Sequence, residues 1–304
     1  MQKFSKTSIV DLTSNWLYQR FHFDAKARHK TLEQEFLRRL TNQSASALRL
    51  LDLGSGTAAN FLYLSMQIPA KQHWILVESN QQLLEDVPKN LELLAQFFGS
   101  ELATDWFARL QSGEISYELR CQDFFKDSLL LFREGFDAIT ANAVFDLNSS
   151  EQFRDLLQSI KQTRSLQAQL YFTLHLNSEL SFLPEHPDDS FIGQSYHDHM
   201  SRPQDFGQAM GASAAEQMQQ ELLAERYKVQ TGSSPWHISA QDQVFFEQNL
   251  HFMQTALMTD EMSEDDITKC GEWFAYRKSC RGQVDSPSTI MNVGHLDILA
   301  AVSD

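Results

Sequence analysis

An acidic residue followed by two closely spaced glycines is the chemically most informative pattern in the sequence. Asp52 lies in the apolar run 48–53, and Gly54 and Gly56 follow it. The two glycines permit a tight turn and let the backbone approach a ligand closely. The apolar stretch 58–67 then predicts a helix whose N-terminal amides point back at that ligand.

A second acid follows another apolar run, a little over twenty residues after the first glycine. The run 73–78 ends at Glu78 and is typical of a buried strand. An acid at this place can accept hydrogen bonds from both hydroxyls of a ribose. The glycine turn and the second acid together indicate a nucleoside-containing cofactor.

Asp52 discriminates between the two kinds of cofactor that fit this pattern. Gly54, Gly56 and Ala59 formally satisfy the loose dinucleotide motif. A dinucleotide would, however, bring an anionic pyrophosphate beside the Asp52 carboxylate. S-adenosylmethionine brings a cationic ammonium and sulfonium, which a nearby carboxylate attracts. We therefore expect S-adenosylmethionine, and the alternative is that Asp52 only caps loop amides.

The same residues resemble motif I of class I S-adenosylmethionine-dependent methyltransferases. The match is Leu51-Asp52-Leu53-Gly54-Ser55-Gly56-Thr57, with a departure at Ala58, where the family usually has a third glycine. The resemblance implies that Glu78 binds the ribose and that Asp123 meets the adenine amino group after the third strand. It also implies that 136–143 is the fourth strand and the start of the loop after it.

Further matches extend from about residue 16 to 300 and resemble a poorly characterised bacterial group of small-molecule-type methyltransferases. They imply a subgroup and leave the substrate open. The matching residues are Trp16-Leu17, Arg20, Asp24, Ala25, Arg28, Pro187-Asp188-Asp189, His199, Arg202, Phe206-Gly207, Ser234-Pro235-Trp236 and Val293-Gly294-His295-Leu296-Asp297.

The residues expected to hold the cofactor come from the N-terminal segment, the strand ends and the following loops. Arg28 is a candidate for a bidentate contact with the cofactor's carboxylate, a role that Arg20 could equally take. Phe124 could place its ring against the adenine or simply belong to the core. The full set is Arg28, Asp52, Gly54, Ser55, Gly56, Asn60, Glu78, Ser79, Asp123, Phe124 and Asn142.

Methyl transfer depends chiefly on holding the nucleophile and the methyl group close and aligned. A base is needed only if the nucleophile loses a proton. Candidate bases are Asp146 after the fourth strand, His175 at the end of the fifth and His199 beyond it. Asp146 could instead cap the helix that starts near Ser149. The histidines show no metal-ligand spacing, so we expect no metal. Candidate acceptor-binding residues are Arg20, Tyr196 and Arg202.

Composition narrows the class of protein further. The formal net charge of −15 argues against a nucleic-acid substrate, which calls for a basic face. Three widely spaced cysteines do not make a disulfide framework. The N-terminal residues show no secretory signal, and no stretch approaches the length of a membrane helix. We expect a cytoplasmic enzyme acting on a small molecule, with no membrane association.

Alternating strand and helix patterns predict an α/β fold with right-handed crossovers. The resemblance implies a doubly wound, seven-stranded, mostly parallel sheet. Expected strands are 48–53, 73–78, 115–121, 136–141, 168–175, 227–231 and 289–302. Expected helices are 58–67, 80–98, 99–113, 150–163, 213–226, 239–258 and 263–279.

The N-terminal segment and the segment 177–212 are expected to cover the open top of the sheet, at the carboxyl ends of its strands. Residues 1–47 form an N-terminal helical cap, with Ile9, Leu12, Trp16 and Leu17 on one helix face. Residues 48–304 form the methyltransferase domain, with a helical insertion at 239–279. Its segment 177–212 contains three prolines and three glycines, which predicts a lid without a regular element.

Two other functions remain open at this point. A nicotinamide-dependent oxidoreductase would call for a second catalytic domain and would prefer no acid at position 52. A methyltransferase-like subunit that binds but does not catalyse is supported by Ala58 alone.

Overall fold

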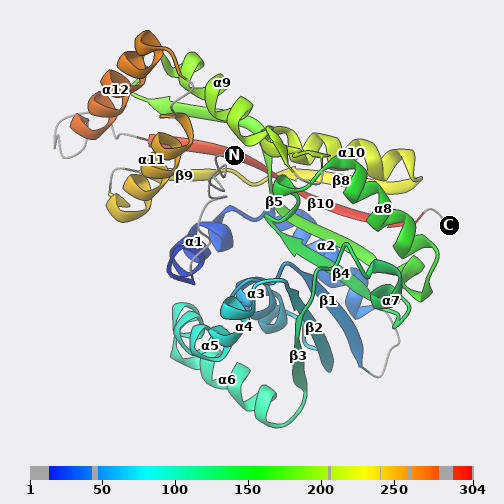
Figure 1. Cartoon of the computed structure of the whole chain (residues 1–304). Coiled ribbons are helices and arrows are strands. Elements are labelled where there is room, and N and C mark those ends of the chain that lie inside the picture. The colour runs from blue at the N-terminus through cyan, green and yellow to red at the C-terminus, as the bar shows by residue number, and fades with distance from the viewer. Residues whose placement is uncertain are drawn as a thin grey trace.

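Short apolar runs form the central strands of an eight-stranded mixed sheet, shown in Figure 1. The computed structural model describes residues 14–42, 47–204, 207–239, 241–258, 262–280 and 290–302. The strands of this sheet are β1 (Leu48–Leu53), β2 (Gln72–Glu78), β3 (Ile115–Cys121), β4 (Ala138–Asn142), β5 (Gln169–Leu183), β8 (Tyr227–Ser233), β9 (Trp236–Ser239) and β10 (Ile290–Val302).

The strand order is β3-β2-β1-β4-β5-β10-β8, and β9 pairs with β10 beside this path. Neighbours from β3 to β5 are parallel, whereas β10 runs antiparallel to β5, β8 and β9. The chain therefore winds outward in both directions from β1, and the order reverses between β1 and β4. Ligands of such sheets bind beyond the carboxyl ends of the strands at this reversal. The expected doubly wound, mostly parallel sheet is confirmed, with short β9 added to it.

Side chains of β1 alternate between two cores, as a doubly covered strand requires. Leu48 and Leu50 belong to one apolar cluster, and Leu51 and Leu53 belong to the other. Helices whose residues join the first cluster are α1 (Ser14–Ala27), α2 (Lys30–Thr41), α3 (Ala59–Gln67), α4 (Gln81–Glu85), α5 (Val87–Ala95) and α6 (Ser100–Gln111). Helices of the second are α7 (Ser128–Phe132), α8 (Ser150–Lys161) and α10 (Ala214–Ala224).

A third apolar cluster lies at one end of the sheet, where β5 and β10 run on past their neighbours (Figure 1). Around it gather α1 (Ser14–Ala27), α9 (Asp189–Met200), α11 (Gln243–Leu257) and α12 (Glu264–Ser279). Trp16 of α1 stacks on Phe245 of α11, with ring centroids 5.1 Å apart. Apolar packing thus attaches the N-terminal helix to this outer layer. None of the described helices has the length and apolarity needed to cross a membrane.

The expectation of an irregular segment at 177–212 is wrong. Strand β5 continues to Leu183 because β10 pairs with it as far as Ile290, and a twelve-residue helix, α9, follows. Pro184 and Pro187 lie in the connection between β5 and α9, so neither interrupts an element. The small strands β6 (Pro203–Gln204) and β7 (Gly207–Gln208) come after α9.

The other helices and strands differ less from the elements expected from the sequence. The helix expected at 80–98 is divided into α4 and α5, and Pro88 occupies the first turn of α5, where its missing N–H costs nothing. Strand β9 and helix α7 have no counterpart among the expected elements. Ile9 and Leu12 of the expected N-terminal face lie outside the described residues.

Candidate functional site

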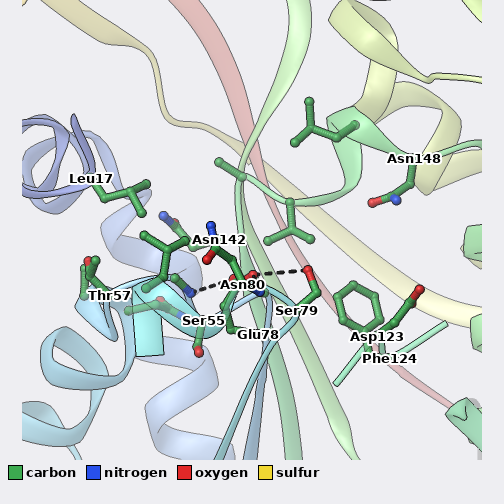
Figure 2. A pocket seen from close by; sticks show the side chains of 18 of the residues that line it. Leu17, Ser55, Thr57, Glu78, Ser79, Asn80, Asp123, Phe124, Asn142 and Asn148 are labelled. Carbon is green, nitrogen blue, oxygen red and sulfur yellow. Dashed lines mark hydrogen bonds between the residues drawn. The ribbon is translucent and has the colours of Figure 1, made fainter. Parts of the chain in front are cut away.

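A cavity of about 570 Å³ opens at the carboxyl ends of β1, β2 and β4, where the strand order reverses. Figure 2 shows Glu78 near its middle, with Asp123 and Phe124 on one side and Leu17 and Thr57 on the other. Its volume is within the usual range for a pocket that encloses a small ligand. The lining residues are Leu17, Arg20, Asp24, Gly54, Ser55, Gly56, Thr57, Ala59, Asn60, Glu78, Ser79, Asn80, Leu83, Asp123, Phe124, Phe125, Asn142, Ala143, Val144, Leu147, Asn148 and Gln152.

The turn between β1 and α3 uses three residues in the left-handed region. Gly54, Gly56 and Ala58 have φ values of 60°, 53° and 66°. Ala58, at the start of α3, therefore adopts the conformation for which glycine is normally required, at a cost of about 1–2 kcal/mol. Ala58 thus takes up a left-handed conformation in this turn although it carries a Cβ atom.

We expect Gly54→Ala to damage this turn. A Cβ atom there would lie 2.6 Å from a methyl carbon of Val144, in addition to the strain of a positive φ. The unfolding free energy should fall by about 1–3 kcal/mol, and ligand binding in the cavity should weaken at least about tenfold. Urea unfolding and calorimetry measure the two effects. Gly193→Ala in α9, with open space around the added Cβ, is the control, and equal behaviour of the two variants would contradict the expectation.

Glu78 joins the ends of β1 and β2 across the floor of the cavity. Its Oε2 accepts the backbone N–H of Gly56 at 3.1 Å. Its Oε1 accepts the backbone N–H of Asn80 at 2.9 Å and the hydroxyl of Ser79 at 3.3 Å, the latter bond dashed in Figure 2. The carboxylate is thereby fixed at the cavity wall, where it can accept hydrogen bonds from a ligand diol.

Asp123 and Phe124 form the opposite wall. Asp123 accepts the backbone N–H of Phe125 at 3.1 Å, and its other oxygen pairs with Lys126 at 2.9 Å. Phe124 is 8% exposed and lines the cavity while it packs edge-on against Phe145 in the second cluster. At this one position Phe124 can belong to the apolar core and also present its ring to a ligand in the cavity.

Asp52 lies beneath the glycine turn, buried behind the residues that line the cavity. Its Oδ1 accepts the side-chain amide of Asn60 and the hydroxyl of Thr140, both at 2.6 Å. Its Oδ2 has no hydrogen-bond partner among the described residues. Burial raises the pKa of Asp52 to about 6, although the bonds from Thr140 and Asn60 and the charge of Arg28 oppose this rise. The donors to Oδ1 are side chains, whereas capping of the loop would have used backbone amides.

Arg28 and Arg20 occupy different places. Arg28 is 4% exposed, lies behind the cavity wall and stacks over the ring of Tyr63 at 4.4 Å. Arg20 lines the cavity, where it holds Asp24 through two hydrogen bonds of 3.0 and 3.3 Å and lies over the ring of Trp236. Of the two arginines, Arg20 is the one that a ligand in the cavity can meet directly.

Asp146, one of the candidate bases, lies in the short helical turn 145–147 that follows β4. His175, expected at the end of the fifth strand, lies inside β5, because pairing with β10 extends that strand to Leu183. Neither residue lines the cavity. Asp146 accepts the backbone N–H of Leu176 at 3.1 Å, and burial raises its pKa to about 7. It does not cap α8, because Ser149 and Gln152 form that helix's capping box. Both ring nitrogens of His175 are buried with no partner in the described part of the chain, and burial lowers the pKa of His175 to about 3.

The remaining three candidates belong to α9 or follow it, and none of them lines the cavity. His199 is hydrogen-bonded to Arg202 at 2.8 Å, and burial together with that guanidinium lowers its pKa to about 4. Tyr196 packs against the third apolar cluster, and burial raises its pKa to about 12. In the structure, His199, Tyr196 and Arg202 form part of the outer layer.

Several cavity residues were not among the site residues expected from the sequence. Asp24 follows Arg20 by four positions on α1, a helical ion-pair spacing that could have indicated it. Val144 and Asn148 carry no sequence signal, because only the folded loop after β4 brings them to the cavity.

Within the described ranges, no three His, Cys, Asp or Glu side chains gather in a way that could hold a metal ion. No disulfide bond joins Cys121, Cys270 or Cys280 in the part of the chain that the structure describes.

No family model and no curated protein matches the sequence. Solved structures that match its fold include a cyclopropane-fatty-acyl-phospholipid synthase-like protein from Lactobacillus casei, 12% identical, which covers 91% of this chain and 99% of its own with a TM-score of 0.49.

Two further similar structures are S-adenosylmethionine-dependent methyltransferases solved with S-adenosylhomocysteine. The protein from Thiobacillus denitrificans is 12% identical over 96% of this chain and 99% of its own, with a TM-score of 0.42. The protein from Geobacter sulfurreducens is 10% identical over 93% and 98%, with a TM-score of 0.40. Because these sequence identities and TM-scores are low, the function of this chain is inferred from the residues of its own cavity.

Proposed function

We propose that this chain is an S-adenosylmethionine-dependent methyltransferase that methylates an O, N or S atom of a small molecule in the cytoplasm. The observation that carries this proposal is the Asp52 carboxylate, buried beneath the glycine turn with one oxygen left without a partner. An unpaired buried carboxylate is costly unless a cation completes it. S-adenosylmethionine has a cationic end, whereas a dinucleotide would bring a pyrophosphate to the same turn.

The other cavity residues fit the remaining parts of this cofactor. Glu78 is held by the turn and presents carboxylate oxygens for the two ribose hydroxyls. Asp123 and the ring of Phe124 provide a hydrogen-bond acceptor and an apolar face for the adenine. When bound, the cofactor supplies an electrophilic methyl group on a cationic sulfur.

On the acceptor side, we assign the role of proton acceptor to Asp146, which is buried behind the residues that line the cavity. It follows β4 and accepts the backbone N–H of Leu176, next to His175 in β5. A pKa of about 7 suits the Asp146 carboxylate to take a proton near neutral pH. Such a base serves a hydroxyl group or a protonated amine, which must lose a proton, whereas a thiolate or a neutral amine needs none. Arg20, fixed by Asp24 and Trp236, is the cation available to an anionic part of the acceptor.

The proposal is tested by incubating the purified protein with methyl-labelled S-adenosylmethionine and fractions of a bacterial small-molecule extract. We expect label to pass into one fraction while S-adenosylhomocysteine forms in equal amount. Label that never leaves the cofactor, together with oxidation of NADH by any fraction, would show that the protein is an oxidoreductase.

Cofactor affinity is expected to depend on pH through Asp52. Because the folded, ligand-free protein holds the Asp52 pKa at about 6, the carboxylate is charged above that pH and protonated below it. Binding of S-adenosylhomocysteine, which carries an ammonium, should be constant from pH 7 to 8 and should weaken roughly tenfold per pH unit below the pKa. Calorimetry between about pH 5 and 8 measures this, and a flat profile would be inconsistent with contact between Asp52 and the ammonium.

A further inference from the structure

One buried guanidinium group joins the two amide side chains that flank the cavity. Nη2 of Arg28 donates to Oδ1 of Asn60 at 2.7 Å and to Oδ1 of Asn142 at 3.3 Å. Asn60 and Asn142 both line the cavity, from α3 and from the end of β4, whereas Arg28 lies behind them at 4% exposure.

The chemistry of the partners gives each amide a single orientation. A guanidinium can only donate, so each asparagine must turn its oxygen toward Arg28. Each NH₂ group then points the other way, toward a carboxylate that can only accept. Asn60 donates to Asp52 at 2.6 Å, and Asn142 donates to Asp24 at 3.0 Å.

This chain of contacts determines which oxygen of Asp52 is left for a ligand. The Asn60 amide and the hydroxyl of Thr140 both bind Oδ1, while Oδ2 has no partner in the described ranges. With the Asn60 amide reversed, its oxygen would face the Asp52 carboxylate, and the two acceptors would repel each other. The orientation fixed by Arg28 prevents this.

Burial of Arg28 lowers the stability of the folded protein, which favours a role for this residue beyond packing. Its Nε and Nη1 are buried without a hydrogen-bond partner among the residues that the structure describes. Unpaired buried N–H groups reduce stability, and the ring of Tyr63 beneath the guanidinium offsets this in part. A methionine, whose unbranched side chain carries no N–H group, would pack on Tyr63 without that cost.

We propose that Arg28 is a positioning residue that makes the site selective for the amino-acid part of the cofactor. It acts through Asn60 on Asp52, and it need not touch the cofactor itself. This inference rests on the proposed function, because it takes S-adenosylmethionine as the ligand.

The test compares two ligands that share an adenosine moiety. S-adenosylhomocysteine carries the ammonium and carboxylate, and 5′-methylthioadenosine lacks both. Arg28→Met should weaken binding of S-adenosylhomocysteine about 10- to 100-fold, the usual effect of losing a charge-assisted contact, and should change that of 5′-methylthioadenosine less than about threefold. Arg28→Lys, which keeps a cation, should recover part of the loss. The matched control is Lys30→Met, which removes a cation that also contacts Tyr63.

Two further readouts separate positioning from a merely structural role. The pH below which S-adenosylhomocysteine binding weakens should rise in Arg28→Met, because the charged groups acting on Asp52 are Arg28, which lowers its pKa, and Glu78, which raises it. In an Asn60→Ala background, Arg28→Met should have little further effect on this ligand, since the connection is already broken.

An equal loss of both ligands in Arg28→Met, or additive losses in the double variant, would overturn the inference. Those results are distinct from failure of the proposed function, in which the parent protein itself would not bind S-adenosylhomocysteine. If Arg28→Met does not fold, the ligand comparison is made on Arg28→Lys, for which an equal loss of both ligands likewise overturns it.

Discussion

Replacement of Asp52 by asparagine is expected to weaken binding of S-adenosylhomocysteine about 100-fold. The substitution keeps an oxygen that can accept from Asn60 and Thr140, so the buried network under the turn survives. It replaces the unpartnered oxygen by an NH₂ group and removes the negative charge. Loss of a buried charged contact of this kind costs about 2–5 kcal/mol in binding. Isothermal titration calorimetry of the parent and Asp52→Asn measures the difference directly.

The control for this variant is Asp137→Asn. Asp137 immediately precedes β4 and accepts the backbone N–H of Arg49 at 2.7 Å, at the opposite end of the sheet from the cavity. The Asp137→Asn variant should bind S-adenosylhomocysteine with the affinity of the parent protein. Parent-like affinity in Asp52→Asn would remove the main argument for the proposed cofactor.

Replacement of Arg277 by alanine is expected to produce the largest loss of stability. The Arg277 side chain is fully buried and forms an ion pair with Asp189, and it also donates to the carbonyl of Pro184 at 2.5 Å. The Trp273 indole donates to the same Asp189 oxygen at 2.7 Å. One guanidinium therefore connects α12, α9 and the end of β5, and its removal leaves the partly buried Asp189 carboxylate without this cation and opens a cavity.

The expected decrease in unfolding free energy for Arg277→Ala is about 3–5 kcal/mol, measured by urea denaturation. Lys278→Ala is the neighbouring control. Lys278 is exposed and donates to Gln254 at 3.2 Å, so its loss should change stability by less than about 0.5 kcal/mol. A decrease below about 1 kcal/mol for Arg277→Ala would show that the outer layer does not depend on this ion pair.

The sheet could be predicted from the sequence because its signals are local. Each of the runs 48–53 and 115–121 is bounded by turn residues, and the structure has β1 and β3 at those positions. What local patterns do not contain is pairing between distant segments. Strand β5 extends to Leu183 only because β10, more than a hundred residues later, provides hydrogen-bond partners. Pro184 and Pro187, which follow the strand, had instead favoured an irregular segment from residue 177 onward.

The cofactor side of the site was more predictable than the acceptor side for a similar reason. Glu78 is the last residue of β2, Asp123 lies two residues beyond β3, and the carboxyl ends of parallel strands meet at one edge of the sheet. His199 was favoured for its chemistry in a segment expected to be a loop. It belongs to a regular helix that packs in the outer layer, so neither its type nor its spacing could show that it lies away from the cavity.

Arg28 shows what sequence can give and what it cannot. Its place in the N-terminal segment indicated a role near the cofactor, and a direct contact with the cofactor's carboxylate was the simplest form of that role. The side chain instead reaches Asn60 and Asn142, which are 32 and 114 residues away in sequence. A contact between such distant side chains follows from the assembled fold alone.

The central claim, that the cavity holds S-adenosylmethionine, is tested most directly by calorimetric titration of the purified protein with S-adenosylhomocysteine and, in parallel, with NADH. Absorbance of the denatured protein first establishes that no nucleoside has co-purified. The account predicts micromolar binding of S-adenosylhomocysteine and no binding of NADH. Binding of NADH alone, or of neither ligand by nucleoside-free protein, would contradict it.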